Sequence, residues 1–353
     1  MIQKQNEWDA SRWMYNSWSM ISHKKISNVI IPGSHNSVTS SLSCDIANDK
    51  RGIFLKKCSK VVGDKMTHNI GTQWSKYQPL SVLEQLSIGV RYIDISVGID
   101  TTKKIPESPL RCCLGFFSDE VKFVLQIVRD FCLKNTWEFV ILDFRCLNFS
   151  SDGDVFEEAT NLLLVREIED TLGSLLVSSQ SWHRDLSALH ITSQRIFIFY
   201  PTKSNYGFWH RDWMIPRDFI DIMQPCNSVM LFMKQRINLF IKVQDERRQQ
   251  IQTNNTFPRR ESLFVLQIDF TQKEKYHVSR IISSALQYIS GFHVPLCGIP
   301  QNLNADSLTA NETILTLIEN KYHPAFLNVI RLDYIESSQI IQRIVHLNHK
   351  PSA

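Results

Sequence analysis

Short runs of apolar residues, each ending in a polar or glycine-containing turn, constrain the fold of this chain more than any other feature. These runs comprise residues 26–31, 90–97, 110–114, 139–144, 196–200, 263–270 and 327–334. They are short, nearly continuous and rich in Val, Ile and Phe, which is typical of strands buried on both faces. Seven strands are predicted in this way, and an eighth would close a barrel.

Helical signals fall between several of these runs. Ser81 followed by Glu84 is a capping box, and Gly89 ends the short helix that it begins. The segment 118–134 places apolar residues on one face of a second helix, and a serine at 337 or 338 precedes a third. Because strands alternate with helices, the sequence predicts an α/β fold with a parallel sheet, namely a TIM-like (β/α) barrel that departs from full regularity.

Length and composition limit the number of domains, the kinds of partner and the cellular location that we expect. A chain of 353 residues with 43% hydrophobic content suits one barrel domain over residues 1–353, with the polar segment 244–260 as a connection or excursion. The formal net charge of +4 gives no argument for a nucleic-acid partner. The amino-terminal segment lacks the apolar core of a signal peptide, so we expect a cytoplasmic protein with reduced cysteines.

A histidine stands at the end of the first predicted strand. It belongs to the run Ile31-Pro32-Gly33-Ser34-His35-Asn36-Ser37. The carboxyl edge of the strands holds the active site in β/α barrels, so His35 is a candidate catalytic residue. The same turn is also consistent with a histidine that only fixes its own loop.

A second motif lies downstream of this turn. Residues 85–95, Gln-Leu-Ser-Ile-Gly-Val-Arg-Tyr-Ile-Asp-Ile, lead a capped helix through Gly89 into a strand with a carboxylate near its end. Together with the Gly-Ser-His turn, this motif resembles the X-domain of phosphatidylinositol-specific phospholipases C, above all the small X-domain-only proteins and the bacterial enzymes. Further segments of the resemblance are Trp13-Met14, the region of Gln73, residues 114–117, residues 137–144, Phe208-Trp209 with Trp213, residues 263–267 with Thr271, residues 328–334, and Leu347-Asn348.

The resemblance implies a reaction and half of its catalytic machinery. Such enzymes turn the inositol 2-hydroxyl onto phosphorus, which requires a base, an acid for the leaving oxygen, and positive charge on the phosphate. His35 matches the general base of the family, and Asp333 matches the carboxylate that orients it. Asn36, Asp94, Asp143 and Arg145 are the expected supporting or phosphate-binding residues. The implied ligand is an inositol phospholipid or inositol phosphate, reached through peripheral membrane contact by the barrel loops.

The other half of the machinery is replaced. Leu114 stands where the family has the histidine that acts as general acid, and Ser96 stands where it has a phosphate-binding arginine or a second carboxylate. Losing a positioned acid costs roughly 10²- to 10⁴-fold in rate. We therefore expect an impaired enzyme, unless Arg145, Arg111 or Lys122 has moved into the pocket.

Two hypotheses about function stay open at this point. One is a working phosphodiesterase of the phospholipase C type, in which a non-standard residue serves as the acid. The other is an inactive relative that binds an inositol phosphate head group or a protein partner. No cofactor is expected, although Asn36, Asp94 and Asp143 carry oxygen ligands of the kind that calcium prefers.

Several of these residues also have plain structural interpretations. Asp94 and Asp143 could satisfy backbone donors at strand ends, and Leu114 reads as core. Trp209 and Trp213 read as packing residues, with a membrane-touching loop as the alternative. Cys112 and Cys113 lie within a strand and are not expected to be nucleophiles.

Overall fold

The computed structural model describes the chain in several ranges. These are residues 8–102, 108–148, 154–201, 209–210, 263, 265–268, 308, 311–313, 315–316, 318–320 and 328–349. The polar segment 244–260 and Trp213 lie outside them, as does the side chain of Trp209. The expectation of a single domain therefore stays a prediction.

The centre of the fold is a mostly parallel sheet. Its parallel strands are β1 (Ile31–Ser34), β2 (Tyr92–Ile99), β5 (Val140–Asn148), β6 (Ile196–Tyr200), β7 (Trp209–His210), β8 (Val265–Ile268) and β9 (Val329–Leu332). They pair in the order β7-β6-β5-β2-β1-β9-β8, so strands from the two ends of the chain meet in the middle. Within the described residues this series is open, with β7 and β8 at its two ends.

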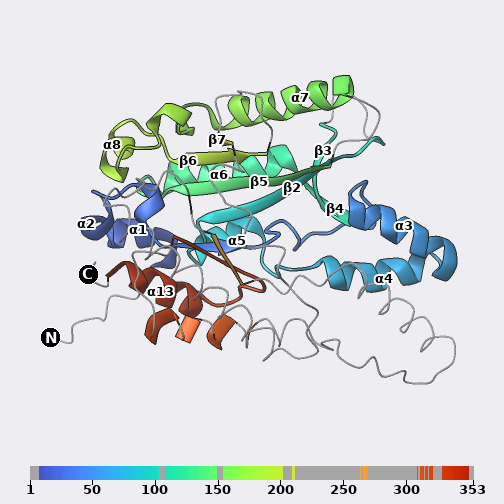
Figure 1. The fold of residues 1–353 in the computed structure, drawn as a ribbon, viewed down its shortest axis with the longest axis horizontal. Coiled ribbons are helices and arrows are strands. Elements are labelled where there is room, and N and C mark those ends of the chain that lie inside the picture. Colours follow the sequence, from blue (N-terminus) through green and yellow to red (C-terminus); the bar gives the residue numbers. More distant parts are fainter. Residues whose placement is uncertain are drawn as a thin grey trace, which may run out of the picture.

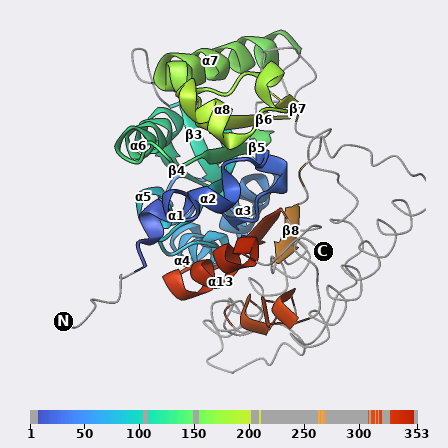
Figure 2. The same cartoon turned by 90° about the vertical axis from the view of Figure 1, so that its left-hand side faces the viewer.

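Helices cover the outside of this sheet (Figure 1, Figure 2). The α-helices are α1 (Trp13–Asn16), α2 (Trp18–Ile21), α3 (Lys50–Val62), α4 (Asp64–Ser75), α5 (Val82–Ser87), α6 (Val121–Lys134), α7 (Asp154–Leu172), α8 (Leu186–Ile191) and α13 (Ser338–His346). Short 3-10 segments are η1 (Ala10–Arg12), η2 (Ile26–Asn28), η3 (Gly173–Leu175), η4 (Ser179–Ser181) and η7 (Leu347–His349). Helix α6 packs between α5 and α7, while α13 packs on β1. A large apolar cluster fills the space between the sheet and most of the helices, and smaller clusters lie near α3 and the β3–β4 hairpin.

The predicted helix signals are confirmed. Ser81 and Glu84 form both hydrogen bonds of the capping box at the start of α5, and Ser337 caps α13. Helix α6 buries the predicted apolar face, although it begins at Val121 because Ser118 belongs to the preceding strand. These signals are local, which is why the sequence alone locates them.

The first predicted strand is misplaced. Residues 26–31 were expected to form it, but Ile26–Asn28 form η2 and β1 begins only at Ile31. The reason is a long-range contact, because the side-chain amide of Asn328 donates to the carbonyls of Ile26 and Val29. The strand is thus the Ile-Pro-Gly-Ser tetrapeptide itself. At Gly33 a Cβ atom would meet side-chain atoms of Tyr92 and Val329 at 3.0 Å, so the narrow space between β2 and β9 requires glycine.

The third predicted strand does not continue the parallel series. Strand β3 (Leu110–Leu114) pairs antiparallel with both β2 and β4 (Phe116–Glu120), forming a hairpin at the edge of the main path. A parallel crossover needs about a dozen residues or more, and residues 100–109 are too few. Gly115 makes the tight reversal between β3 and β4 at φ 76°, a conformation that favours glycine.

A buried ion pair ties the amino-terminal segment to the sheet. Arg91 Nη2 lies 2.8 Å from Glu138 Oε2, and both side chains are buried. Glu138 also accepts from the backbone amides of Met14 and Tyr15, while Arg91 donates to the carbonyl of Ser11. Every strong donor and acceptor of the pair therefore has a partner, which is the condition under which a buried pair is tolerated.

Glu138→Gln is expected to lower the free energy of unfolding by about 3–5 kcal/mol, because Arg91 would remain buried without its counter-charge. Urea denaturation followed by circular dichroism measures the change. Glu169→Gln, on the exposed face of α7, is the matched control and should change stability by less than about 0.5 kcal/mol. Equal stability of Glu138→Gln and Glu169→Gln would contradict this assignment.

Two further expectations concern the thiols and membrane spans. Among the described cysteines, Cys44, Cys58, Cys112 and Cys132 are free thiols. Burial raises the pKa of Cys112 far above its usual value and that of Cys132 to about 12, so neither is a nucleophile. Among the described helices, none combines the length and apolar character needed to cross a bilayer.

Candidate active site

The centre of the site is a histidine–carboxylate pair formed by neighbouring strand ends. Ser34 of β1 lies beside Leu332 of β9 in parallel register, so the next residues, His35 and Asp333, also meet. The His35 amide donates to the Leu332 carbonyl at 2.9 Å. His35 Nδ1 lies 2.7 Å from Asp333 Oδ1, and both side chains are buried. The structure thus brings together two predicted residues separated by 298 positions in the sequence.

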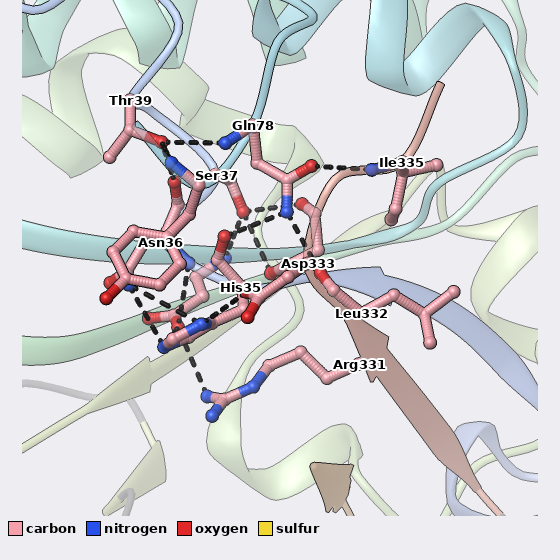
Figure 3. A network of polar contacts seen from close by, with 12 residues as sticks. His35, Asn36, Ser37, Thr39, Gln78, Arg331, Leu332, Asp333 and Ile335 are labelled. Carbon is pink, nitrogen blue, oxygen red and sulfur yellow. Dashed lines mark hydrogen bonds and ion pairs between the residues drawn. The ribbon is translucent and has the colours of Figure 1, made fainter. Parts of the chain in front are cut away.

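The backbone around this pair is held in unusual conformations. Asn36 and Tyr334, which follow His35 and Asp333, have φ values of 46° and 49°, in the left-handed region that side chains disfavour. Gln78 joins the two turns, since its Nε2 donates to the carbonyls of His35 and Leu332, and its Oε1 accepts from the amide of Ile335 (Figure 3). Such over-determined backbone strain is common at functional sites.

The hydrogen bonds around His35 define its tautomer. Its Nε2 lies 3.0 Å from Asn36 Nδ2 and 3.3 Å from Arg145 Nη1. Arginine can only donate, and Asn36 Oδ1 accepts from Arg145 Nη2 at 2.6 Å, so the Asn36 amide points its NH₂ at the ring. Nε2 therefore carries the lone pair, and Nδ1–H donates to Asp333. This is the tautomer that a general base needs.

Asp94 lies between two guanidinium groups. Its Oδ1 is 3.1 Å from Arg145 Nε, and its Oδ2 is 3.1 Å from Arg331 Nη1. The Asn36 amide also donates to Oδ2. Burial acts to raise the pKa of Asp94, but the guanidinium charges of Arg145 and Arg331 outweigh it, so the pKa lies below its usual value. Asp94 is thus an anion that anchors two cations beside His35.

An irregularity in the sheet directs Arg145 into the site. Asp94 and Ile95 of β2 pair with Asp143 and Phe144 of β5, but Ser96 pairs with Cys146. Arg145 is thus the extra residue of a β-bulge. Bulges commonly re-aim a side chain next to an active site, and here the guanidinium reaches Asp94, Asn36 and His35. Its side chain is 24% exposed, whereas His35 and Asp94 are fully buried.

Asp143 has a different environment from Asp94. The two are register partners on adjacent parallel strands, so their side chains point to the same face of the sheet. Asp143 is buried, and its Oδ2 accepts from the hydroxyl of Tyr92 at 2.5 Å. It lies in the wall of the site on the side of β5.

Both positions at which the chain departs from the pattern that it resembles lie outside this network of contacts. Leu114 ends β3 and is half-buried, so the expectation that it is ordinary core is wrong. Ser96 of β2 lies directly after the register shift opposite the bulge in β5, and its side chain is half-buried. Three cations were named above as residues that could have moved into the pocket. Among the described contacts, only Arg145 of these three reaches the His35–Asp333 dyad. Arg111 pairs with Asp100 at 3.1 Å, and Lys122 is exposed on α6 near Glu167.

The oxygen ligands proposed for calcium do not fit a cation. The Asp94 carboxylate already pairs with Arg145 and Arg331, so a divalent ion would meet two positive groups at its main ligand. Within the described residues, no cluster of three or more histidine, cysteine or carboxylate side chains is arranged to hold a metal. The charge available for an anionic ligand here comes from arginine.

Sequence reasoning missed three residues of the site. Arg331 was part of the resemblance but was given no role, although an arginine inside an apolar run is a signal in itself. The structure buries its side chain completely. Gln78 carries no local signal, because its contacts join distant turns. The ring of Tyr77 packs edge-on against His35 with centroids 5.2 Å apart, and nothing in the sequence indicates this contact.

The chain is similar in sequence to proteins whose names refer to a PI-PLC X domain. It is 30% identical over 181 residues to a PI-PLC X-box domain-containing protein of Dictyostelium discoideum, a match that covers 50% of this chain and 21% of that protein. It is 21% identical over 352 residues to PI-PLC X domain-containing protein 3 of Bos taurus, covering 98% of this chain and 96% of that protein. The chain thus spans about a fifth of the first relative and nearly all of the second. No family model matches the chain.

The fold is similar to that of solved bacterial enzymes. The phosphatidylinositol-specific phospholipase C of Listeria monocytogenes superposes with a TM-score of 0.53 at 15% identity, over 96% of this chain and 99% of that enzyme. At this identity the likeness concerns the fold alone. It agrees with the predicted TIM-like α/β architecture.

Proposed function

Since this chain is a homologue of the PI-PLC X domain-containing proteins, we propose that it cleaves a phosphodiester of an inositol lipid type, slowly and without a metal ion. His35 acts as the base for a hydroxyl neighbouring the phosphate, and Asp333 holds its tautomer. The observation that carries the proposal is the 2.7 Å contact between His35 Nδ1 and Asp333 Oδ1, with Nε2 left as the acceptor.

Arg145 supplies the positive charge in this proposal. In the described structure its guanidinium contacts Asp94, Asn36 and the Nε2 of His35. A phosphate that enters beside Nε2 displaces the Asn36 and Arg145 contacts to the ring, and Arg145 turns to the phosphate oxygens while Asp94 retains it. The bulged Arg145 takes over what an arginine at position 96 does in metal-independent relatives.

Impairment follows from the leucine at the position where the family has its acid histidine. Leu114 cannot protonate a leaving oxygen, so substrates with a poor alkoxide leaving group, such as a diacylglycerol, should suffer most. An aryl leaving group departs without a proton. A p-nitrophenyl diester of inositol phosphate therefore reports the base and the cation separately from the acid.

The test compares release of p-nitrophenol and of inositol phosphate from phosphatidylinositol vesicles, both with EDTA and with calcium. We expect turnover of the aryl diester above the buffer background, unaffected by EDTA. Slower turnover is expected for the vesicles. No turnover of either substrate would contradict the proposal.

A second candidate function is head-group binding without turnover. The observation that favours it is the buried state of His35, whose Nε2 is already paired with Asn36 and Arg145. Under this alternative, an inositol phosphate raises the melting temperature, while neither diester is cleaved. The two functions thus differ in one assay.

Helix α3 provides the surface for membrane contact in this proposal. Its solvent face carries Lys56, Lys57 and Lys60 between the exposed Ile53 and Val61. Lysines flanked by exposed aliphatic side chains suit the interface of an anionic bilayer. The other side of the same helix reaches the site, because Arg51 Nη2 donates to the Tyr77 hydroxyl at 3.3 Å and Tyr77 packs on His35. A bilayer bound to α3 would thus lie near the dyad.

Reversing the three lysines, as Lys56→Glu/Lys57→Glu/Lys60→Glu, should weaken binding to vesicles of mixed phosphatidylcholine and phosphatidylserine by at least about tenfold, since each basic residue near the surface contributes about 1 kcal/mol. Sedimentation with sucrose-loaded vesicles measures the partition coefficient. The control variant is Lys122→Glu/Arg129→Glu/Lys134→Glu on α6. Equal loss in both variants would contradict a docking face on α3. Turnover of the soluble aryl diester should not change.

A further inference from the structure

Tyr77 has a hydroxyl group whose donor capacity is unused in the described structure. Tyr77 is 3% exposed, and its ring packs edge-on against the base His35. Its hydroxyl oxygen accepts from Arg51 Nη2 at 3.3 Å. A phenol has one donor and acceptor capacity, and no acceptor for the Tyr77 proton occurs among the described residues. A nearly buried donor without an acceptor, next to a candidate base, calls for a ligand.

From this geometry we propose that Tyr77 is the general acid that replaces the missing histidine. The inference rests on the proposed phosphodiesterase function. A substrate whose attacking hydroxyl lies against His35 Nε2 has its phosphorus beside the same ring that Tyr77 contacts. The leaving oxygen then falls within reach of groups that line this ring, which is the first requirement for an acid.

Arg51 makes this phenol suited to the task. Its guanidinium donates to the Tyr77 oxygen and lies over the Tyr77 ring, with its carbon 5.5 Å from the ring centroid. The Arg51 guanidinium therefore lies where negative charge develops on the Tyr77 oxygen as the proton moves to the leaving oxygen.

The atoms balance in a single displacement. The substrate hydroxyl gives its proton to His35 Nε2, and its oxygen bonds to phosphorus. The bond from phosphorus to the leaving oxygen breaks, and that oxygen takes the Tyr77 proton. The products are a cyclic phosphodiester and an alcohol, and the protein is left with an imidazolium and a phenolate. Proton transfer from His35 to Tyr77 through solvent restores the initial state.

The backbone of Tyr77 places the side chain precisely enough for this role. Its amide donates to Thr39 Oγ1 at 3.0 Å, and its carbonyl accepts from the Tyr334 amide at 2.8 Å. Tyr77 is thus joined to the loops that follow both His35 and Asp333. Acid, base and orienting carboxylate are held by one set of hydrogen bonds.

The test uses Tyr77→Phe, which keeps the ring contact with His35 and removes only the hydroxyl. We expect turnover of phosphatidylinositol to fall roughly 10²- to 10⁴-fold, whereas turnover of the p-nitrophenyl diester changes by less than about threefold, because that leaving group needs no proton. Tyr15→Phe, an exposed tyrosine at the amino-terminal segment, is the matched control and should retain both activities.

The outcomes separate this inference from the proposed function. Equal loss on both substrates would mean that Tyr77 only positions His35, which overturns the inference. An unchanged lipid rate in Tyr77→Phe would overturn it as well. A wild-type protein that cleaves the aryl diester but not the lipid would leave the proposed function standing and show that no acid is present. A wild-type protein inactive on both would defeat the proposed function first.

Discussion

His35→Ala is expected to reduce turnover of the p-nitrophenyl diester by roughly 10²- to 10⁴-fold, which is the rate enhancement that a positioned general base typically contributes. The aryl diester is the right substrate, because its leaving group does not depend on an acid. His35 Nδ1 contacts Asp333 at 2.7 Å, and Nε2 accepts from the amide of Asn36 and from Arg145, so the ring is oriented to accept a proton. No other described side chain has this arrangement beside Arg145.

The control for this prediction keeps the ring but not its orientation. Asp333→Asn would leave His35 without a carboxylate to fix its tautomer and should cost nearly as much rate as His35→Ala. Circular dichroism of both variants checks that the fold persists. The double variant His35→Ala/Asp333→Asn should be no slower than either single variant, since the pair acts as a unit. Unchanged turnover in His35→Ala would remove His35 from the catalytic machinery.

Arg145→Gln is expected to lower turnover of both substrates by about 10²- to 10³-fold, because it removes the electrostatic stabiliser of the phosphate. Both substrates should be affected alike, since the charge acts on phosphorus and not on the leaving group. Arg145→Lys should recover only part of the rate, because lysine cannot contact Asp94 and a phosphate in the forked geometry of a guanidinium. Arg129→Gln on α6 is the matched control. A rate of Arg145→Gln equal to that of the wild type would exclude Arg145 from phosphate binding.

Arg145→Gln should also change the stability of the fold at acid pH. The pKa of Asp94 in the folded state lies below its unfolded value, despite burial, because of Arg145 and Arg331. Its charge therefore stabilises the fold above the unfolded pKa, and this contribution is lost as the pH falls through the folded pKa. Without Arg145 the pKa is depressed less, so the acid unfolding midpoint of Arg145→Gln should move to higher pH. A midpoint equal to that of Arg129→Gln would contradict this coupling.

Local patterns predicted those parts of the fold whose causes are local. The capping box at Ser81 and the apolar face of α6 depend on residues a few positions apart, and both are confirmed. The start of β1 was misjudged because Asn328, at the far end of the chain, captures the carbonyls that precede it. The β3–β4 hairpin was taken for a parallel strand because an apolar run does not reveal its direction.

In the site too, features with local causes could be predicted and those that depend on long-range contacts could not. His35 and Asp333 could be paired from the resemblance, and the parallel register of β1 and β9 brings them together. Arg145 could be named but not placed, because the bulge that directs it is a register shift between β2 and β5. Tyr77 and Gln78 join the site through contacts between loops, for which residue type and spacing carry no signal. Ser96 and Leu114, at which the chain departs from the resemblance, were informative because they led to the proposals for Arg145 and Tyr77.

The central claim is that His35, oriented by Asp333 and assisted by Arg145, cleaves a phosphodiester without a metal ion. Phosphorus NMR of the p-nitrophenyl inositol phosphate diester, incubated with the purified protein in EDTA, tests it most directly. We predict a cyclic phosphodiester signal that grows with the wild type and not with His35→Ala. A spectrum that stays unchanged with the wild type, while the same diester raises its melting temperature, would contradict the claim and indicate a binding protein.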